Sequence, residues 1–377
     1  MYLTFYRQKT NNHVQLNRPN YTVADLFEAV EYIEPEVIVT PRIREDFETT
    51  TVITDRFPAN MDDSKLNQIL QELKQLTREF QKETLLFHYS TFYIPKATFG
   101  QYREINAPDN QLMDALRRMK DIFQYKLNVL YHNSAFAYVP HRSIKHALEK
   151  HTRRNSKWFL KLDIKNFFPS CNQEFVVKML RKIYPFSYYS EEDLNSFIWL
   201  CFRLNQLPQG TPMSPMLTNL LMIPIDYAIE KFAQENNLVY TRYADDILLS
   251  SGVKWDWQLT VQSINTIFRT MGTPFSIKDE KTRFGSSAGR NWNLGLMVNK
   301  DNNITVGYRN KKKYRAAIDQ LFTVVKETND VDREDLQHFQ GVTAYYLSIE
   351  PEYFQSIIRR YEQKYNLNLK DIYKRFL

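Results

Sequence analysis

Two adjacent aspartates, Asp245 and Asp246, lie between two runs of β-prone residues at 238–241 and 247–250. This pattern predicts a hairpin with the acidic pair at its tight turn. Two like charges in a turn between apolar strands repel each other unless a positive charge lies beside them. Carboxylate oxygens are hard ligands that suit Mg²⁺ or Mn²⁺, so the pair is a candidate metal site. A solvated Asp-Asp turn is the alternative, and it is the commoner one for an isolated pair.

A third carboxylate, Asp163, lies in a predicted strand at 158–164. Leu160, Leu162 and Ile164 alternate with it, so one face of the strand can pack on helices while Asp163 points into a cleft. The long stretch between Asp163 and Asp245 leaves room for a crossover through helices to a neighbouring strand. Three carboxylates on one sheet suit phosphoryl or nucleotidyl transfer with two metal ions, which argues against the solvated turn.

A glycine flanked by prolines, Gly210, lies between the two acidic segments in the run LPQGTPMSP at 207–215. Helix-forming residues follow from Met216, so the segment predicts a loop that enters a helix. Backbone N–H groups at such an entrance can hold a phosphate or the edge of a nucleotide.

In chain order, LDIKNFFPS, LPQGTPMSP followed by Asn219, and RYADD resemble motifs A, B and C of reverse transcriptases. The resemblance is closest to the bacterial branch that contains retron, group II intron and phage-defence enzymes. Residues 93–108 resemble the fingers motif that grips the incoming triphosphate, and residues 135–144 resemble the next fingers block. Residues 276–282 resemble motif D, and residues 293–295 the primer-grip region. With a thumb-like segment at 340–361, the resemblance covers residues 85 to 365.

The resemblance implies an α+β right-hand polymerase fold, with an antiparallel palm sheet, helices beneath it, a helical fingers extension and a helical thumb. We expect fingers at 63–155, a palm interleaved with the fingers at 156–300, and a thumb at 301–377. Residues 1–62 form an N-terminal extension of unknown role. Apolar stripes at helical spacing predict amphipathic helices at 64–82 and 112–130.

The resemblance also implies roles for individual residues. Asp163, Asp245 and Asp246 are the expected catalytic and metal-binding carboxylates for two Mg²⁺ ions, with Mn²⁺ as a substitute. Lys281 is a weaker candidate for protonating the leaving pyrophosphate, and Lys278 competes for that role. The expected substrate-binding residues are Lys96 and Arg103 on the triphosphate, Gln209 on the nucleotide and template base, and Phe168 as the ring that excludes a 2′-hydroxyl.

Charge is unevenly distributed along the chain. The net charge is +7 at pH 7, yet residues 25–63 hold eleven acidic residues against three arginines, so positive charge concentrates elsewhere. One basic run interleaved with aromatics favours a nucleic-acid surface at the start of the thumb, with a solvated helical face as the alternative. This run comprises Arg309, Lys311, Lys312, Lys313 and Arg315.

Two cysteines, Cys171 and Cys201, argue against a disulfide framework and are typical of a reducing compartment. The sequence has no run of about 18 apolar residues and no signal-peptide pattern, so we expect no membrane association and a cytoplasmic location.

The function implied is RNA-directed DNA synthesis, with an RNA template, a DNA product and dNTPs as partners. Retron enzymes carry NAxxH and VTG signatures, where this chain has HALEKH at 146–151 and NLG at 293–295. Group II enzymes usually continue past the thumb, whereas this sequence ends at Leu377. These features favour a defence-associated enzyme. A dedicated non-coding RNA, a second copy of the chain and an associated defence protein are left open as partners.

Four alternatives stay open. The chain could be a retron-type or group II-like reverse transcriptase with a dedicated RNA template, or a template-independent DNA polymerase of the same fold. It could be an RNA-templated RNA polymerase, although Phe168 argues against a ribonucleotide enzyme. A non-catalytic RNA-binding scaffold is disfavoured by the intact set of Asp163, Asp245 and Asp246.

Overall fold

The computed structural model describes residues 62–95, 100, 102–127, 129–287 and 292–377. Contacts divide the chain into two compact units. The first contains the described residues up to Arg142 together with Leu160–Leu249 and Lys254–Phe284. The second contains Ser143–Phe159, Ser250–Val253 and Gly285–Leu377. This division does not follow the expected fingers, palm and thumb boundaries, which stay a prediction, as does the role of residues 1–62.

A four-stranded sheet carries the acidic motifs, and its strands follow the order β4-β5-β3-β6. The turn Ala244-Asp245 joins β4 to β5, and a two-residue connection of this kind makes the two strands antiparallel. The predicted hairpin and the predicted strand before Asp163 are both confirmed, except that only Asp245 lies in the turn while Asp246 opens β5. The strands are β3 Trp158–Asp163, β4 Val239–Tyr243, β5 Asp246–Ser251 and β6 Arg283–Ser286.

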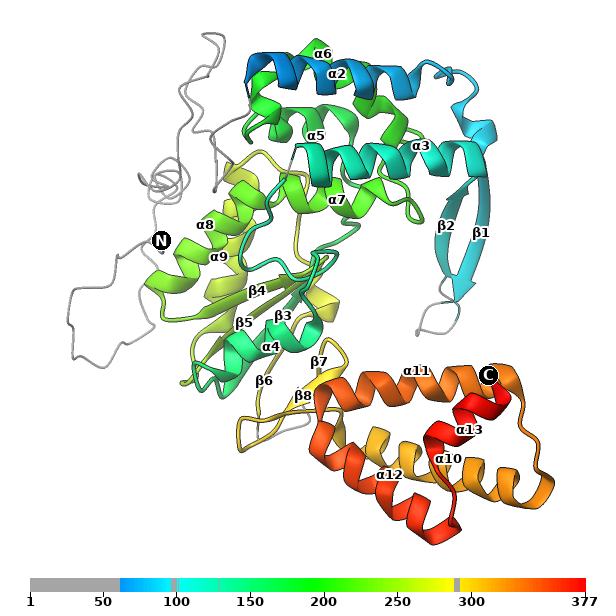
Figure 1. Ribbon diagram of the computed structural model, residues 1–377. Coiled ribbons are helices and arrows are strands. Elements are labelled where there is room, and N and C mark those ends of the chain that lie inside the picture. The colour runs from blue at the N-terminus through cyan, green and yellow to red at the C-terminus, as the bar shows by residue number, and fades with distance from the viewer. Residues whose placement is uncertain (1–61, 96–99, 101, 128, 288–291) are drawn as a thin grey trace. The chain divides into compact units, whose positions relative to one another are not determined.

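Two helices cover one face of this sheet, as Figure 1 shows. Helix α8 (Ile223–Glu235) contacts β4 and α9 (Trp257–Thr270). Pro224 stands in the first turn of α8, where its missing N–H costs nothing, and the Asp256 side chain accepts hydrogen bonds from the first turn of α9. The apolar sides of both helices are buried, which supplies the helical layer expected beneath the palm sheet.

Five further helices pack against one another in the first unit. The helix expected at 64–82 ends early, because Arg78 N–H bonds the carbonyl of Gln75 and tightens the last turn. The helix expected at 112–130 ends at Asp121 and continues as a π-helical turn, Ile122–Lys126. The five are α2 Asp63–Thr77, α3 Asn110–Asp121, α5 Gln173–Leu180, α6 Glu191–Ile198 and α7 Met213–Leu221. Short 3₁₀ turns lie at Leu85–His88, Phe186–Tyr188, Trp199–Cys201 and Asp279–Lys281.

A two-stranded ribbon, β1 (Tyr89–Pro95) and β2 (Tyr102–Pro108), pairs antiparallel with Tyr93 opposite Glu104. Most side chains of β1 are exposed on both faces of the ribbon, so the ribbon is held by its base and its hydrogen bonds. Lys96 lies outside the described residues.

The second unit combines helices with a small sheet. Helix α4 (Ile144–Thr152) contacts two strands of the antiparallel sheet β7-β8-β9. Tyr314 joins α10, α11 and α12 by packing on Phe339 and Phe354, with ring centres 5.4 and 4.9 Å apart. These elements are β7 Trp292–Asn293, β8 Leu296–Val298, β9 Ile304–Thr305, α10 Gly307–Thr328, α11 Arg333–Ile349, α12 Pro351–Tyr365 and α13 Leu369–Phe376.

The α+β right-hand polymerase fold expected from the sequence is confirmed, with helices on one face of the sheet that carries the motifs and a helical C-terminal region. Within the described part of the chain, none of the helices has the length and apolar character that crossing a membrane requires.

Candidate active site

The three aspartates predicted to bind metal lie together at the ends of adjacent strands. Asp163 is the last residue of β3, Asp246 is the first residue of β5, and Asp245 lies in the turn before it. The backbone N–H of Ile164 donates to the carbonyl oxygen of Asp245 over 2.9 Å. This bond holds the turn against the end of β3, so Asp163 lies close to Asp245 and Asp246 although it is distant from them in sequence.

The charges of this cluster are poorly compensated. Burial, and then the carboxylates of Asp246 and Asp163, raise the pKa of Asp245 to about 6. Burial also raises the pKa of Asp246, although the ammonium group of Lys161 opposes that shift. The cluster therefore holds more negative charge than its surroundings stabilise, which is a property of sites that bind cations.

Two lysines neutralise part of this charge. Lys161 Nζ lies 3.1 Å from Asp246 Oδ1, and Lys281 Nζ lies 2.5 Å from Asp163 Oδ2. Lys161 stands two residues before Asp163 and therefore on the same face of β3. Lys281 is brought in because Lys278 N–H donates to the carbonyl of Asp163 over 2.8 Å. Burial lowers the pKa of Lys281, but its hydrogen bond to Asp163 and the nearby carboxylates raise it overall, so it stays charged.

Among the described residues, no three acidic, histidine or cysteine side chains are grouped as a ready-made metal site. Asp163 and Asp246 are instead each engaged by an ammonium group. The raised pKa of Asp245 shows that the three carboxylates still interact. Their oxygens are the donors that hard divalent cations prefer, so the residues fit such an ion once the lysines release them.

The motif B loop is tied to the β1–β2 ribbon. The N–H of Asn106 in β2 donates to the carbonyl of Gln209 over 2.7 Å. Gly210 follows with φ of +119°, and a Cβ there would lie 2.9 Å from the carbonyl oxygen of Asn106. Only glycine fits this close approach. Arg103 is exposed on the same strand, so the loop and the strand that carries Arg103 are held together.

Phe168 lies in the turns after β3, half-buried, with its ring centre 5.5 Å from that of Phe167. The buried neighbour fixes one side of the Phe168 ring and leaves the other side partly open. This placement is compatible with the predicted steric role, which stays a prediction.

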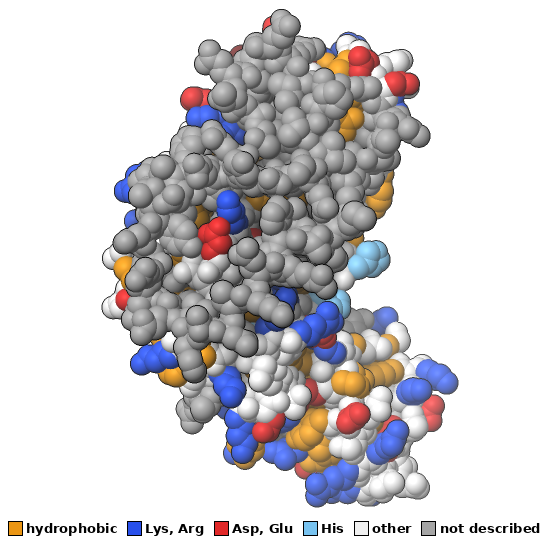
Figure 2. Space-filling model, turned by 90° about the vertical axis from the view of Figure 1, so that its left-hand side faces the viewer, with side chains coloured by type: hydrophobic (Ala, Val, Ile, Leu, Met, Phe, Trp, Pro, Cys, Tyr) orange, Lys and Arg blue, Asp and Glu red, His pale blue; other side chains and the backbone are white. Residues whose placement is uncertain are grey.

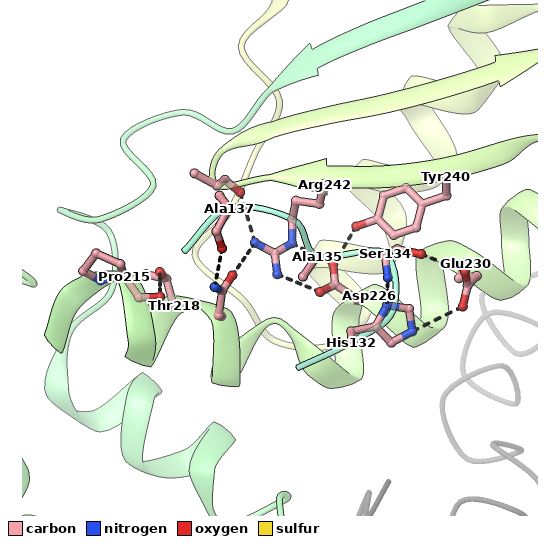
Figure 3. Close-up of polar contacts among 12 residues, drawn as sticks. His132, Ser134, Ala135, Ala137, Pro215, Thr218, Asp226, Glu230, Tyr240 and Arg242 are labelled. Carbon is pink, nitrogen blue, oxygen red and sulfur yellow. Dashed lines mark hydrogen bonds and ion pairs between the residues drawn. The ribbon is translucent and has the colours of Figure 1, made fainter. Parts of the chain in front are cut away.

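A fully buried ionic network lies behind the Asp245 turn (Figure 3). Arg242 of β4 and Asp226 of α8 form an ion pair of 2.7 Å in which neither side chain is exposed. The Tyr240 hydroxyl donates to the same carboxylate over 2.6 Å. Such a pair requires every polar atom to be satisfied. Arg242 Nη1 completes its contacts by donating to Asn219 Oδ1 and to the carbonyl of Ala244.

The same network also holds residues 134–137 of the first unit by hydrogen bonds. Asn219 Nδ2 donates to the carbonyl of Ala137 over 2.8 Å, and the two backbones exchange bonds between Ser134, Phe136 and Arg242. Residues 132–137 therefore lie directly beside β4, as the labelled side chains of His132, Ser134 and Arg242 in Figure 3 show.

In the second unit, the predicted basic run lies on α10. Arg309, Lys312 and Lys313 are exposed, and Arg315 is partly exposed beside the ring of Tyr308. Lys311 differs, because its Nζ lies 2.5 Å from Glu350 Oε1 and 4.2 Å from the ring centre of Tyr353.

Lys311 is therefore engaged inside the helical unit rather than presented to a phosphate. Where the side chains in Figure 2 are not grey, blue Lys and Arg side chains are mixed with red acidic and orange apolar ones.

Sequence reasoning found the three aspartates but assigned no role to Lys161, Arg242 or Tyr138. For Lys161, the available signal is its spacing of two residues from Asp163 on a strand. For Arg242, the signal is a charged residue within an apolar strand, which requires a buried partner. For Tyr138, whose backbone is left-handed with φ of +58°, the sequence offers no signal, because the surrounding structure sets that conformation.

Comparison with known proteins gives one family and several relatives. The family described as "Reverse transcriptase (RNA-dependent DNA polymerase)" matches residues 94–308. The retron Ec83 reverse transcriptase of Escherichia coli is 30% identical over 284 residues, which cover 73% of this chain and 87% of the relative. The retron Ec73 reverse transcriptase of Escherichia coli is 31% identical over 245 residues, covering 62% and 75%.

Among solved structures, apo telomerase from Candida tropicalis is similar at a TM-score of 0.45 and 14% identity, covering 79% of this chain and 64% of that one. This likeness is too weak to support a conclusion.

Proposed function

Because this chain belongs to the reverse transcriptase family as a bacterial retron-type member, and is therefore an RNA-directed DNA polymerase, we propose that it works by two-metal nucleotidyl transfer at Asp163, Asp245 and Asp246. The observation that carries this proposal is the convergence of the three carboxylates, with the pKa of Asp245 raised to about 6 by burial and by its two neighbours. The proposed ions are Mg²⁺, with Mn²⁺ as a substitute.

When bound, these ions lower the pKa of the primer 3′-hydroxyl and neutralise charge on the leaving pyrophosphate. The chain's own residues position the reactants. Asp163, Asp245 and Asp246 would hold the ions; Lys161 and Lys281, now paired with Asp246 and Asp163, would then give up these contacts, and Lys281 would be free to face the leaving group. Arg103 holds the triphosphate with its guanidinium fork, a geometry that suits bidentate contacts with phosphate.

Gln209 and Phe168 complete the proposed substrate pocket. The Gln209 carbonyl is fixed by Asn106, which leaves its side chain to contact the nucleotide and the template base. Phe168 excludes the 2′-hydroxyl by the size of its ring. Lys96, which lies outside the described residues, is assigned to the triphosphate with Arg103.

The test is primer extension by the purified chain on an RNA template with a DNA primer, dNTPs and Mg²⁺. We expect the parent to extend the primer and the double variant Asp245→Ala Asp246→Ala to lose extension by at least about 10³-fold. The matched control Asp301→Ala removes an exposed carboxylate in the second unit and should retain parental activity. Full extension by the double variant would contradict the proposal.

We further propose that the enzyme acts in the bacterial cytoplasm as part of an anti-phage system. The support is the resemblance of its motifs to the branch that includes phage-defence enzymes. A sensitive bacterial host carrying the chain with its native flanking genes should show fewer phage plaques, and the Asp245→Ala Asp246→Ala variant should restore them. Equal plaque numbers with the parent and with an empty vector would exclude this role for the phages tested.

A further inference from the structure

Two non-glycine residues with left-handed backbone are held beside each other at the catalytic turn. Tyr138 has φ of +58° and Ala244 has φ of +57°. The residue before Tyr138 is Ala137, whose carbonyl accepts from Asn219 Nδ2 over 2.8 Å. Asn219 Oδ1 in turn accepts from Arg242 Nη1, which also donates to the carbonyl of Ala244.

The buried Asn219 and Arg242 side chains thus connect the backbone just before Tyr138 to the backbone just before Asp245. Two further hydrogen bonds, both from Arg142, hold the residues just before Tyr138. Arg142 Nη1 donates to the carbonyls of His132 and Ala135 over 2.6 and 2.7 Å. The backbone at Ala137, just before Tyr138, is therefore held by the same network that holds the backbone at Ala244, just before Asp245.

The side chain of Tyr138 is not used to build the core, since 59% of it is exposed. Its polar neighbours are catalytic candidates. Burial of the phenol and then the charges of Asp245 and Tyr243 raise the pKa of Tyr138, while the guanidinium of Arg103 lowers it. The ring therefore lies in the region that also contains a metal-binding carboxylate and the cation assigned to the triphosphate.

A left-handed conformation is unfavourable for a residue with a large side chain, and it persists where the surroundings impose it. A purely structural turn at this position is served better by glycine or asparagine, and the other left-handed positions of the described chain are largely asparagines and glycines. An exposed tyrosine held there by a buried network that also holds the Asp245 turn points to a ligand.

We propose that the ring of Tyr138 is a substrate-contacting surface for the incoming deoxynucleotide, packing against its base and sugar while Arg103 contacts its triphosphate, beside the ions that Asp245 would hold. This assignment rests on the proposed polymerase function. An incoming nucleotide is the ligand that fits. Its triphosphate requires a cation such as Arg103, its bound ions require a carboxylate such as Asp245, and the charges of both residues act on the Tyr138 phenol. Aromatic packing of this kind is indifferent to base identity, since every base has a π-face.

The experiment compares steady-state dNTP incorporation and thermal unfolding for Tyr138→Gly, Tyr138→Phe and a control, at saturating template and primer. The control is Asn237→Gly, which relieves a left-handed residue with φ of +53° at the far end of β4. Tyr138→Gly should raise the KM for dNTPs about 5- to 50-fold, with a smaller change in kcat. Its unfolding temperature should not fall, because glycine adopts this conformation without strain.

Tyr138→Phe keeps the ring and should stay within about twofold of the parent KM, and Asn237→Gly should match the parent in KM and kcat. An unchanged KM in Tyr138→Gly would overturn the proposal, as would a loss in Tyr138→Phe as large as in Tyr138→Gly. A fall in the unfolding temperature of Tyr138→Gly would instead assign the ring a structural role. If the parent itself incorporates no dNTP, the proposed function fails rather than this contact.

Discussion

The three aspartates of the candidate site differ in how their charges are balanced. The described contacts give Asp163 and Asp246 one lysine each, whereas the side chain of Asp245 receives none. The pKa of Asp245 is accordingly raised to about 6 by burial and by the other two carboxylates. Without bound metal, ionisation of Asp245 near neutral pH therefore disfavours the folded state.

This imbalance predicts how stability depends on pH. A carboxyl whose pKa is raised on folding stabilises the folded state below its unfolded pKa of about 3.9, and that stability is lost as pH rises through about 6. At pH 7.5 without metal, Asp245→Asn should raise the free energy of unfolding by about 1–2 kcal/mol after allowance for solvent screening. For a chain of this length the corresponding rise in Tm is about 1–2 °C per kcal/mol, measurable by scanning fluorimetry.

The same variant should respond less to Mg²⁺. The parent gains stability on metal binding by linkage, while Asp245→Asn loses a ligand and should show a smaller shift in Tm at each Mg²⁺ concentration. Asp301→Asn, an exposed change in the second unit, serves as the control and should behave like the parent. A metal-free Asp245→Asn protein that melts below the parent at pH 7.5 would show that the repulsion is not significant.

Phe168 gives a second prediction at the level of one residue. Its ring packs on Phe167 on one side, so shortening it should open space without collapsing the segment. Phe168→Val should improve the use of rNTPs relative to dNTPs by about 10- to 100-fold in kcat/KM. Competition between matched rNTP and dNTP substrates measures this ratio. A parent enzyme that already incorporates both sugars equally well would remove the basis for a steric gate at this position.

On helix α10, one lysine packs inside the helical unit while other basic side chains are exposed. Lys311 contacts Glu350 and Tyr353, so its charge is engaged within the helical unit. Arg309, Lys312 and Lys313 are exposed and have no such use. Repulsion between like charges one turn apart costs about 0.2–0.5 kcal/mol per pair, and a phosphate backbone is a partner that offsets it.

We therefore predict that Arg309→Gln Lys312→Gln Lys313→Gln weakens RNA binding for all sequences. The slope of log K against log salt concentration should flatten by up to about 0.9 for each duplex phosphate that the variant no longer neutralises. The control Lys65→Gln Arg78→Gln Arg117→Gln removes three exposed charges at α2 and α3. It should leave the slope unchanged. Equal slopes for the α10 variant and the parent would assign this run to a solvated helical face.

Local patterns were sufficient to predict the elements that carry the catalytic residues. The alternation around Asp163 and the β-prone runs beside Asp245 depend only on neighbouring residues, so β3 and the β4–β5 hairpin could be predicted. The pair of Arg242 with Asp226 and the bond from Asn219 to Ala137 could not, because the partners are 16 and 82 residues apart. Helix ends were also misplaced. The hydrogen bonds that close α2 and α3 depend on the local geometry of the last turn, which the periodicity of apolar residues does not report.

At the scale of the whole molecule, the candidate catalytic residues and the basic helix lie in different compact units. Asp163, Asp245, Arg103 and Tyr138 belong to the first unit, and the α10 basic face belongs to the second. The family assignment explains why a carboxylate cluster and a basic helix occur in one chain, since a polymerase must hold metal, nucleotide and template at once. The net charge of +7 favours association with nucleic acid in general but does not select a sequence.

The last prediction concerns which RNA the whole molecule selects. Backbone electrostatics give non-specific binding only, and helical surfaces recognise duplex RNA mainly by its shape. Selectivity for one RNA would therefore come from recognition of a structured RNA by its shape, and we predict that this enzyme has such a partner. When the chain is purified from its host and the bound nucleic acid is sequenced, we expect one non-coding RNA to dominate the reads, with cDNA copied from it. The Asp245→Ala Asp246→Ala protein should retain the RNA and lose the cDNA. Reads in proportion to cellular RNA abundance would contradict a dedicated template, and cDNA matching no RNA would favour template-independent synthesis.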